Sequence, residues 1–337
     1  SAVIGFDNCA NIGNITKTAE SVARDGCIGG IVSLIDGQTD GSTKNTKKEV
    51  TFANSIVNKG SISTNGTTAS LIVGGVLGHL NYYINASFNG PVTNYGPISH
   101  AGTSTDTPTI GGVIGRIIQN VTIQVNKNIT NVEDADITVS ATIQSGTSYE
   151  NASIGGILGT LSHLDSSSPN YAARVKSSIY VNGITVCNDA KITFSGKGSD
   201  VRIGGYIGYN FVSFTYLTNK GKVVNNGEIE ITENSEITTC LSVGGIAGQI
   251  NQGNVRGMGW TDAETGQDVN TGDIHFKGSA KAVCIGGFVG RNYGGITNTY
   301  VINTGNIYAT GEVTGTSYKV VGGLVGRVAN SGTYYQC

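Results

Sequence analysis

Charged residues are scarce in this chain. Asp, Glu, Lys and Arg make up 13% of its 337 residues, about half the share usual in soluble domains. The formal net charge of −2 argues against a nucleic-acid-binding surface, which needs a concentrated basic face. No apolar run is long enough to cross a bilayer. Proline is limited to four residues, and the 3.6-residue periodicity of amphipathic helices is essentially absent. These absences leave an all-β chain as the expectation.

Side chains that carry catalysis or hold metals are also sparse. The four histidines are dispersed, and the six cysteines form no Cys-x-x-Cys pair. The acidic stretches at 133–136 and 228–236 fall at different phases of the sequence pattern, which favours solvated faces over a glycosidase-like pair. We therefore expect no catalytic residue, no metal and no cofactor, and we predict that the chain is not an enzyme.

Glycine is abundant, with 51 residues, and it recurs in a fixed pattern. A β-branched residue followed by Gly-Gly occurs eight times, at intervals of 36 to 49 residues. An apolar residue follows each pair, and seven copies then carry a third glycine. The pattern lacks the Gly-x-Gly-x-x-Gly order of a dinucleotide site. The first glycines of the pairs are Gly29, Gly74, Gly111, Gly155, Gly204, Gly244, Gly286 and Gly322.

A second motif, Asn-x-Gly-x-Ile, precedes each glycine pair. Six copies are complete, and two are degenerate, with Glu133 and Ala135 in one and Ala190 in the other. The isoleucine is present in all eight copies: Ile15, Ile62, Ile98, Ile137, Ile192, Ile229, Ile274 and Ile307. Two motifs that recur eight times in the same order indicate a repeat architecture.

Stacked β-strands explain these residue types. Equivalent residues of successive rungs lie about 4.8 Å apart, so an isoleucine column packs against itself as a dry core. An asparagine column can form a ladder of side-chain amides, and glycine permits corners where a Cβ would clash. We predict a single β-solenoid domain over residues 1–337, with eight rungs of roughly 36–49 residues centred on the glycine pairs.

Two further features are candidates for binding. The residue after the third glycine forms a polar column of His79, Arg116, Thr160, Tyr209, Gln249, Arg291 and Arg327. We expect a plain exposed strand edge there, and the alternative is a stripe that binds an anionic glycan or a partner. The insertion at 251–269 holds the only Trp, Trp260, with Asp262 and Glu264 nearby. Trp260 could stack on a sugar ring, and the acids could hold Ca²⁺, although their spacing fails the EF-hand pattern.

The C-terminal part of the chain resembles a known repeat. The stretch from Gly286-Gly-Phe-Val-Gly290 to Asn303-Thr-Gly-Asn-Ile307 is similar to the GLUG motif, and weaker copies surround Gly204, Gly244 and Gly322. The resemblance implies a secreted or surface-displayed repeat protein of adhesin-like type. It implies no catalytic residues, because the repeat is a scaffold element.

Function is expected to follow from the repeats. Unpaired strand edges template pairing with another chain, and a head-to-tail contact that does not close gives a filament. We predict a structural subunit of an extracellular or cell-surface filament that assembles with copies of itself. The alternative is a monomeric adhesin module that binds glycan or host protein through its loops. Two disulfides are expected, Cys9–Cys337 between subunits and Cys240–Cys284 within the chain.

Overall fold

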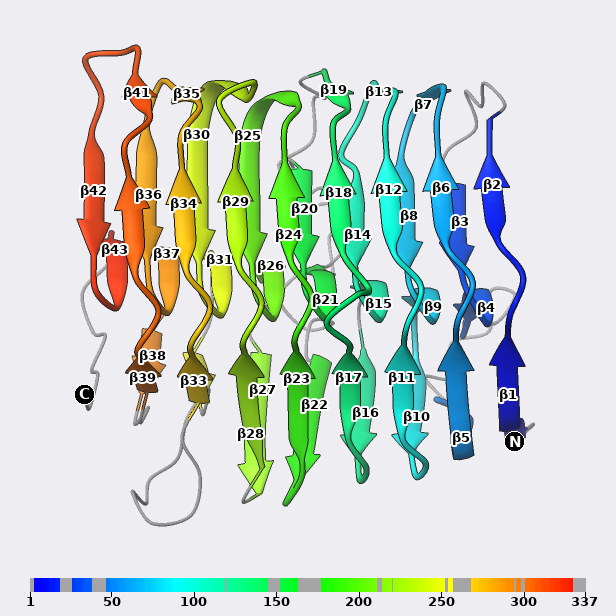
Figure 1. The fold of residues 1–337 in the computed structure, drawn as a ribbon. Helices are drawn as coiled ribbons and strands as arrows, with labels where there is room; N and C mark the ends of the chain where they lie inside the picture. Colours follow the sequence, from blue (N-terminus) through cyan, green and yellow to red (C-terminus); the bar gives the residue numbers. More distant parts are fainter. Residues whose placement is uncertain are drawn as a thin grey trace, which may run out of the picture.

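The computed structural model describes residues 3–18, 26–37, 47–118, 120–144, 152–162, 177–210, 214–219, 221–251, 254–256, 268–293, 295–297 and 301–329. These residues form strands and turns without any helix. The strands belong to four parallel sheets, A to D, which run along one axis (Figure 1). No segment of the described ranges is a helix that could cross a membrane. The predicted all-β solenoid is therefore confirmed.

Sheet A forms the base of the cross-section, and most rungs contribute two strands to it. Its strands are β1 (Val3–Asn11), β5 (Lys48–Asn58), β10 (Ile84–Phe88), β11 (Val92–Asn94), β16 (Val121–Val125), β17 (Ile129–Asn131), β22 (Ser177–Asn182), β23 (Thr185–Asn188), β27 (Phe214–Asn219), β28 (Lys222–Asn225), β32 (Asn254–Arg256), β33 (Asp268–Asn270), β38 (Gly295–Thr297) and β39 (Val301–Asn303).

Sheet B follows directly and contributes one three-residue strand per rung. Its strands are β2 (Ile15–Lys17), β6 (Ile62–Thr64), β12 (Ile98–His100), β18 (Ile137–Val139), β24 (Ile192–Phe194), β29 (Ile229–Ile231), β34 (Ile274–Phe276) and β40 (Ile307–Ala309). The eight repeat isoleucines each begin one of these strands and pair with one another in register.

Sheet C leads to the glycine pairs. Its strands are β3 (Gly26–Gly29), β7 (Thr67–Thr68), β8 (Leu71–Gly74), β13 (Thr103–Ser104), β14 (Thr109–Gly111), β19 (Thr142–Ile143), β20 (Ala152–Gly155), β25 (Lys197–Gly204), β30 (Glu236–Gly244), β35 (Ser279–Ala280), β36 (Val283–Gly286), β41 (Glu312–Val313) and β42 (Lys319–Gly322). The first glycine of every pair ends a strand of this sheet.

Sheet D turns back from the glycine pairs, again with one strand per rung. Its strands are β4 (Val32–Asp36), β9 (Leu77–Asn81), β15 (Ile114–Ile118), β21 (Leu158–Ser162), β26 (Ile207–Asn210), β31 (Ala247–Ile250), β37 (Val289–Asn292) and β43 (Val325–Val328). Sheets B and D are thus both eight-stranded, in agreement with eight rungs.

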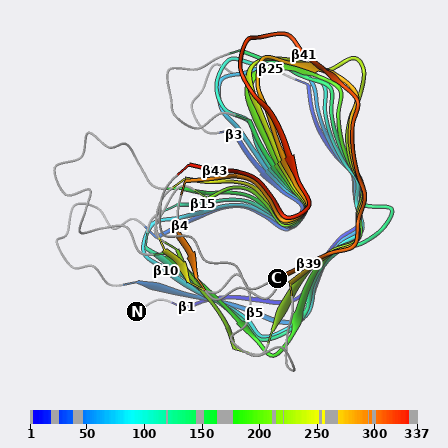
Figure 2. The same ribbon diagram turned by 90° about the vertical axis from the view of Figure 1, so that its left-hand side faces the viewer.

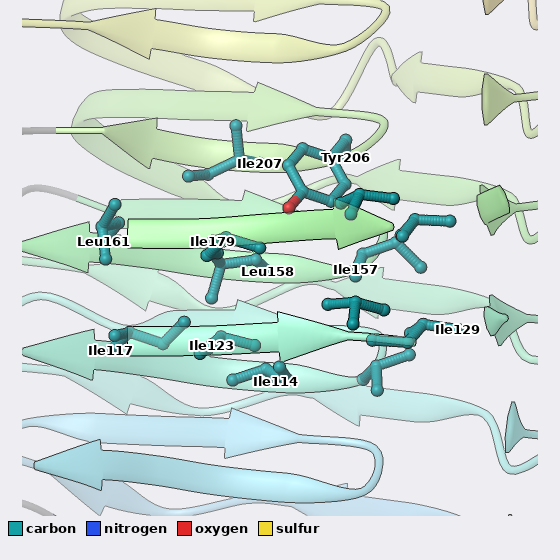
Figure 3. Close-up of a cluster of buried hydrophobic side chains, with 14 of the residues drawn as sticks. Ile114, Ile117, Ile123, Ile129, Ile157, Leu158, Leu161, Ile179, Tyr206 and Ile207 are labelled. Atoms are coloured by element: carbon teal, nitrogen blue, oxygen red, sulfur yellow. The ribbon is translucent and has the colours of Figure 1, made fainter. Parts of the chain in front are cut away.

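The cross-section has two hydrophobic cores rather than one. Sheets C and D meet at a sharp corner that points into the middle of the section (Figure 2). One core lies between sheets A and D, where side chains such as Ile123 and Leu158 stack from rung to rung (Figure 3). The other lies between sheets B and C and contains the isoleucine column. β-branched side chains dominate both cores because they pack well on pleated surfaces.

Candidate functional site

An asparagine ladder runs the length of the solenoid between the two cores. Each side-chain Nδ2 donates to the Oδ1 of the asparagine in the next rung at 2.7 to 3.0 Å. The same nitrogen also donates to a backbone carbonyl of its own rung, as Asn94 does to Gly96 at 2.9 Å. The amides therefore satisfy one another in a buried column, which is the condition for polar groups inside a core. The members are Asn11, Asn58, Asn94, Asn131, Asn188, Asn225, Asn270 and Asn303.

The fourth member corrects the sequence assignment. Asn131, and not Glu133, pairs with Asn94. Rung four has two extra residues before Ile137, and they form a turn at Glu133 and Asp134. The motif spacing concealed this insertion, so the asparagine column is complete although one copy reads as degenerate.

The glycine pairs pack directly against this ladder. A Cβ built on Gly112, the second glycine of the third pair, would lie 2.0 Å from the carbonyl oxygen of Gly156 and 2.6 Å from Nδ2 of Asn131. Equivalent contacts recur from Gly30 to Gly287. None of these glycines has a positive φ, so close approach rather than backbone conformation requires them. We call the asparagine ladder and the glycine pairs together the Asn–Gly spine.

The Asn–Gly spine ends at the first and last described rungs, and its two ends have complementary hydrogen-bonding groups. At the C-terminal rung, Asn303 Nδ2 donates to Gly305, but it has no following asparagine to bond in the described chain. At the N-terminal rung, Asn11 Oδ1 accepts from its own Gly13 backbone, and from no asparagine of the described residues. A Cβ on Gly323, in the last pair, would meet no atom of the described residues within 4 Å. One face therefore offers the donor, and the other offers the acceptor, of one further ladder bond.

Two apolar side chains of the last described rung are also exposed. Val321 and Val328 are 46% and 50% exposed, whereas Ile285 and Ile250, in the same columns of inner rungs, are fully buried. Within the part of the chain that the structure describes, the strands of the last rung pair on one side only, and these two valines lie on that rung.

The polar column on sheet D is buried, which corrects the expectation of an exposed strand edge. Sheets C and D pack closely, and their facing side chains form what we call the C–D seam. His79 lies 3.7 Å from Cys27 of sheet C, and Arg202 donates from Nε to Gln249 at 2.9 Å. The seam includes His79, Arg116, Thr160, Tyr209 and Gln249, all at most 9% exposed, and the half-buried Arg291 and Arg327.

Aromatic rings hold the arginines of the seam. The guanidinium carbon of Arg202 lies 3.9 Å from the ring centroid of Tyr209, and that of Arg327 lies 4.2 Å from Tyr318. Arg202 also pairs with Asp200 at 2.9 Å. Stacking of guanidinium on an aromatic face is favourable when both groups are shielded from water. The seam therefore serves as packing between two sheets, and it is not an open binding stripe.

The cysteines are free thiols wherever the structure describes them. Cys9 packs against the A–D core, while Cys337, its predicted intersubunit partner, lies outside the described residues. Cys240 and Cys284 are buried side by side in the C–D seam without a disulfide between them. The candidate ligand loop with Trp260, Asp262 and Glu264 also lies outside the described residues.

Three glutamates of the described residues, Glu228, Glu230 and Glu236, form ion pairs with lysines of neighbouring rungs. Glu230 accepts hydrogen bonds from Lys191 and Lys277, and these bonds hold its pKa well below the usual range, at about 2. Within the described ranges, no three His, Cys, Asp or Glu side chains come together as metal ligands would. Glu230 is thus a counter-ion between two rungs of sheet B.

His100 should make the fold sensitive to acid. It is buried in the B–C core, with its ring nitrogens 2.9 Å from the hydroxyl oxygens of Thr64 and Ser104. Burial lowers its pKa to about 4 from the ordinary 6.5. The unfolded chain takes up this proton first, so the His100 contribution to stability is lost as pH falls from 6.5 toward 4. Denaturant unfolding should show that the free energy of unfolding falls less between pH 7 and pH 4 for His100→Gln than for the native chain. Equal pH slopes would contradict a buried neutral imidazole.

Asp268 should act in the opposite direction. It occupies a core column between Val223 and Val301, where its Oδ1 accepts from the Val223 amide at 2.8 Å. Burial raises its pKa to about 7 from the ordinary 3.8. Its folded-state contribution is therefore present below pH 3.8 and is lost as pH rises through 7. At about 1.4 kcal/mol per pKa unit, Asp268→Val should raise the free energy of unfolding by about 4 kcal/mol at pH 8.

Unfolding measurements on Asp268→Val at pH 8 and pH 5 check this. The gain should shrink at pH 5, where the carboxyl is protonated in the folded chain. Asp268→Asn, which keeps the shape without the charge, should lose the same pH dependence. A gain independent of pH would assign the effect to packing alone.

Comparisons with known proteins do not relate the spine to an established function. No protein-family model matches the chain, and neither a curated protein nor a solved structure matches it.

Proposed function

We propose that the chain is a structural subunit of an extracellular or cell-surface filament that assembles head to tail. The observation that carries the proposal is the complementarity of the two terminal rungs. The next copy's first rung would continue the Asn–Gly spine, with Asn303 Nδ2 donating to Asn11 Oδ1. It would also cover Val321 and Val328 and pair the open strand edges. The extracellular placement rests on the resemblance to GLUG repeats.

The occupant of the open face is a second copy because the columns match. Inner rungs show what a following rung requires: asparagine in the ladder, isoleucine at the start of the sheet B strand, and glycine at the corner. The first rung supplies all three in Asn11, Ile15 and Gly29. Because successive rungs are related by translation along the axis, such a contact repeats without closing.

Two glycines at the terminal faces allow folding and assembly to be separated. The Cβ of Gly287 would lie 2.3 Å from the Gly323 carbonyl oxygen of the next rung. In a filament, a Cβ on Gly323 would meet Gly30 of the next copy in the same way. At the other end, a Cβ on Gly13 has only one neighbour, at 3.9 Å. Stacking would bring it against Gly305, as the Cβ of Gly60 would meet Gly13 at 1.9 Å.

The experiment is negative-stain electron microscopy of the purified native chain at near-neutral pH, beside Gly323→Ala and Gly13→Ala. The native chain should form filaments with an axial repeat of about 38 Å, which is eight rungs at the strand spacing. Both variants should have the same melting temperature as the native chain, but they should remain short rods. Gly5→Ala is the matched control, because its Cβ meets nothing and its column carries Thr51 and Ser87 in the next rungs.

The outcomes separate the alternatives. Filaments from the native chain and Gly5→Ala, but not from the two terminal variants, would establish assembly through the spine. Filaments from all four proteins would refute the proposed junction. Rods alone from the native chain would refute self-assembly and favour the monomeric adhesin.

A further inference from the structure

Two arginines of neighbouring rungs lie side by side at the C-terminal end of the C–D seam. Arg291 of β37 pairs in register with Arg327 of β43, so their backbones are separated by one strand spacing, about 4.8 Å. Both side chains are half-buried, so solvent reaches them. Within the described ranges, neither guanidinium forms an ion pair with a carboxylate. Two like charges this close and partly shielded from water repel each other, and the arrangement favours a bound anion.

An inner rung shows how the seam accommodates an arginine that has its own counter-ion. Arg202 of β25 pairs with the Asp200 carboxylate at 2.9 Å and donates from Nε to Gln249 at 2.9 Å. Its guanidinium carbon also lies 3.9 Å from the ring centroid of Tyr209. This guanidinium therefore has a negative charge, a hydrogen-bond acceptor and an aromatic ring beside it.

The column that supplies this carboxylate loses its acid toward the C-terminal end. Asp200 pairs in register with Cys240 of β30. The registers of β30 with β36 and of β36 with β42 continue the column with Ala282 and then Tyr318, each one residue before its strand. None of these three later side chains is a carboxylate. The last two rungs thus keep an arginine on sheet D without the acid that faces it in rung five.

Arg291 also has a donor that lacks an acceptor. Its Nε is buried and has no hydrogen-bond partner in the part of the chain that the structure describes. The guanidinium carbon lies 4.4 Å from the ring centroid of Tyr293, and that of Arg327 lies 4.2 Å from the ring centroid of Tyr318. Stacking on a ring uses the face of a guanidinium and leaves its N–H donors, which lie in the plane, available to an acceptor. A buried donor of a charged group is costly to leave unpaired.

We propose that Arg291 and Arg327 together bind a doubly charged tetrahedral oxyanion, a sulfate or phosphate group, at the C-terminal end of the C–D seam. One such group neutralises both guanidiniums, and its oxygens accept from their N–H groups, including Nε of Arg291. A free ion and an ester on a glycan present the same oxygens, so both belong to this ligand class. The site lies within one chain, and the proposal does not depend on filament assembly.

Equilibrium dialysis of the full chain against radiolabelled sulfate, and in parallel against phosphate, tests the proposal at pH 7 and constant ionic strength. Gly323→Ala is dialysed beside the native chain, so that binding is also measured on rods that do not assemble. Each protein should bind one anion per chain. Arg291→Gln and Arg327→Gln should each weaken binding by about tenfold or more, as expected for loss of a charge-assisted hydrogen bond. The double variant should bind none.

Lys319→Gln is the matched control. It removes one positive charge from the same rung, but Lys319 lies on the other face of β42, with its Nζ 5.9 Å from the ring centroid of Phe276. Its affinity for the anion should stay within about twofold of the native value, because a solvated charge on another face contributes only a screened long-range attraction. Arg291→Lys keeps the charge without the planar fork, and its affinity should fall between those of the native chain and Arg291→Gln.

A sulfated disaccharide and its desulfated form distinguish the two sources of the anion. Displacement of sulfate by the sulfated sugar alone, at about one tenth of the concentration of free sulfate or less, would assign the site to a glycan ester. Displacement at equal concentrations would assign it to the free ion. If neither sulfate nor phosphate binds to the native chain or to Gly323→Ala, or if the folded double variant binds as tightly as the native chain, the proposal is overturned. Circular dichroism establishes that each variant is folded.

Discussion

Gly112→Ala should prevent the solenoid from folding. Its Cβ would lie 2.0 Å from the carbonyl oxygen of Gly156 and 2.6 Å from Asn131 Nδ2, and both atoms belong to the buried spine. Neither contact can be relieved by rotating a flexible side chain, because one atom is backbone and the other is held in the ladder. Spreading the rungs would break hydrogen bonds in the sheets on both sides. We expect a loss of unfolding free energy above about 5 kcal/mol, more than the roughly 1–3 kcal/mol typical of overpacking, because neither neighbour can move aside.

Circular dichroism and size-exclusion chromatography of the purified protein measure this effect. Gly323→Ala is the matched control, since it changes the same column where no rung follows and its Cβ meets nothing within 4 Å. The inner variant should be unfolded or aggregated under conditions where the terminal one is native. If Gly112→Ala folds with native stability, the close approach of corner and ladder cannot be correct.

Asn188→Ala should be the next most damaging change. Its amide donates to Ala190 and Asn225 and accepts from Asn131. Truncation to alanine therefore removes a hydrogen-bond partner from three buried polar groups. At one to three kcal/mol for each unsatisfied group, the expected loss is about 4 kcal/mol. The hole left by the amide adds to it, because water has no ready access to the spine.

Denaturant unfolding of the reduced protein at pH 7 measures this loss of unfolding free energy. Asn303→Ala is the comparison within the same ladder, since Asn303 has one asparagine neighbour instead of two. Its loss should be about half as large. Equal effects at both positions would mean that the ladder bonds contribute little, and that only the local turn matters.

Repetition is what made the fold predictable from sequence. The isoleucine column needs no long-range information, since each copy follows its glycine by two residues in six of the eight rungs. Eight in-register copies define eight rungs, and alternation of apolar and polar residues around Ile229 and Ile231 defines the buried face. These signals are local, and they repeat.

The contact between the two motifs could not be predicted in the same way. In rung three, Asn94 and the first glycine of its pair, Gly111, are 17 residues apart in the sequence, and nothing in that spacing says that the corner turns inward onto the ladder. For the same reason, the seam residues read as an exposed edge. Their neighbours across the seam, such as Arg202 for Gln249, come from the opposite arm of the corner.

Parallel strands that cross the axis also determine how this rod carries mechanical load. Strands in all four sheets run across the axis, so the backbone hydrogen bonds between rungs point along it. A pull on the two ends therefore stretches every bond of a rung boundary at once, and the force is divided among them. A sideways force that lifts one sheet at its edge loads the bonds one after another. The same rod should thus resist extension strongly and yet open readily by peeling from one side.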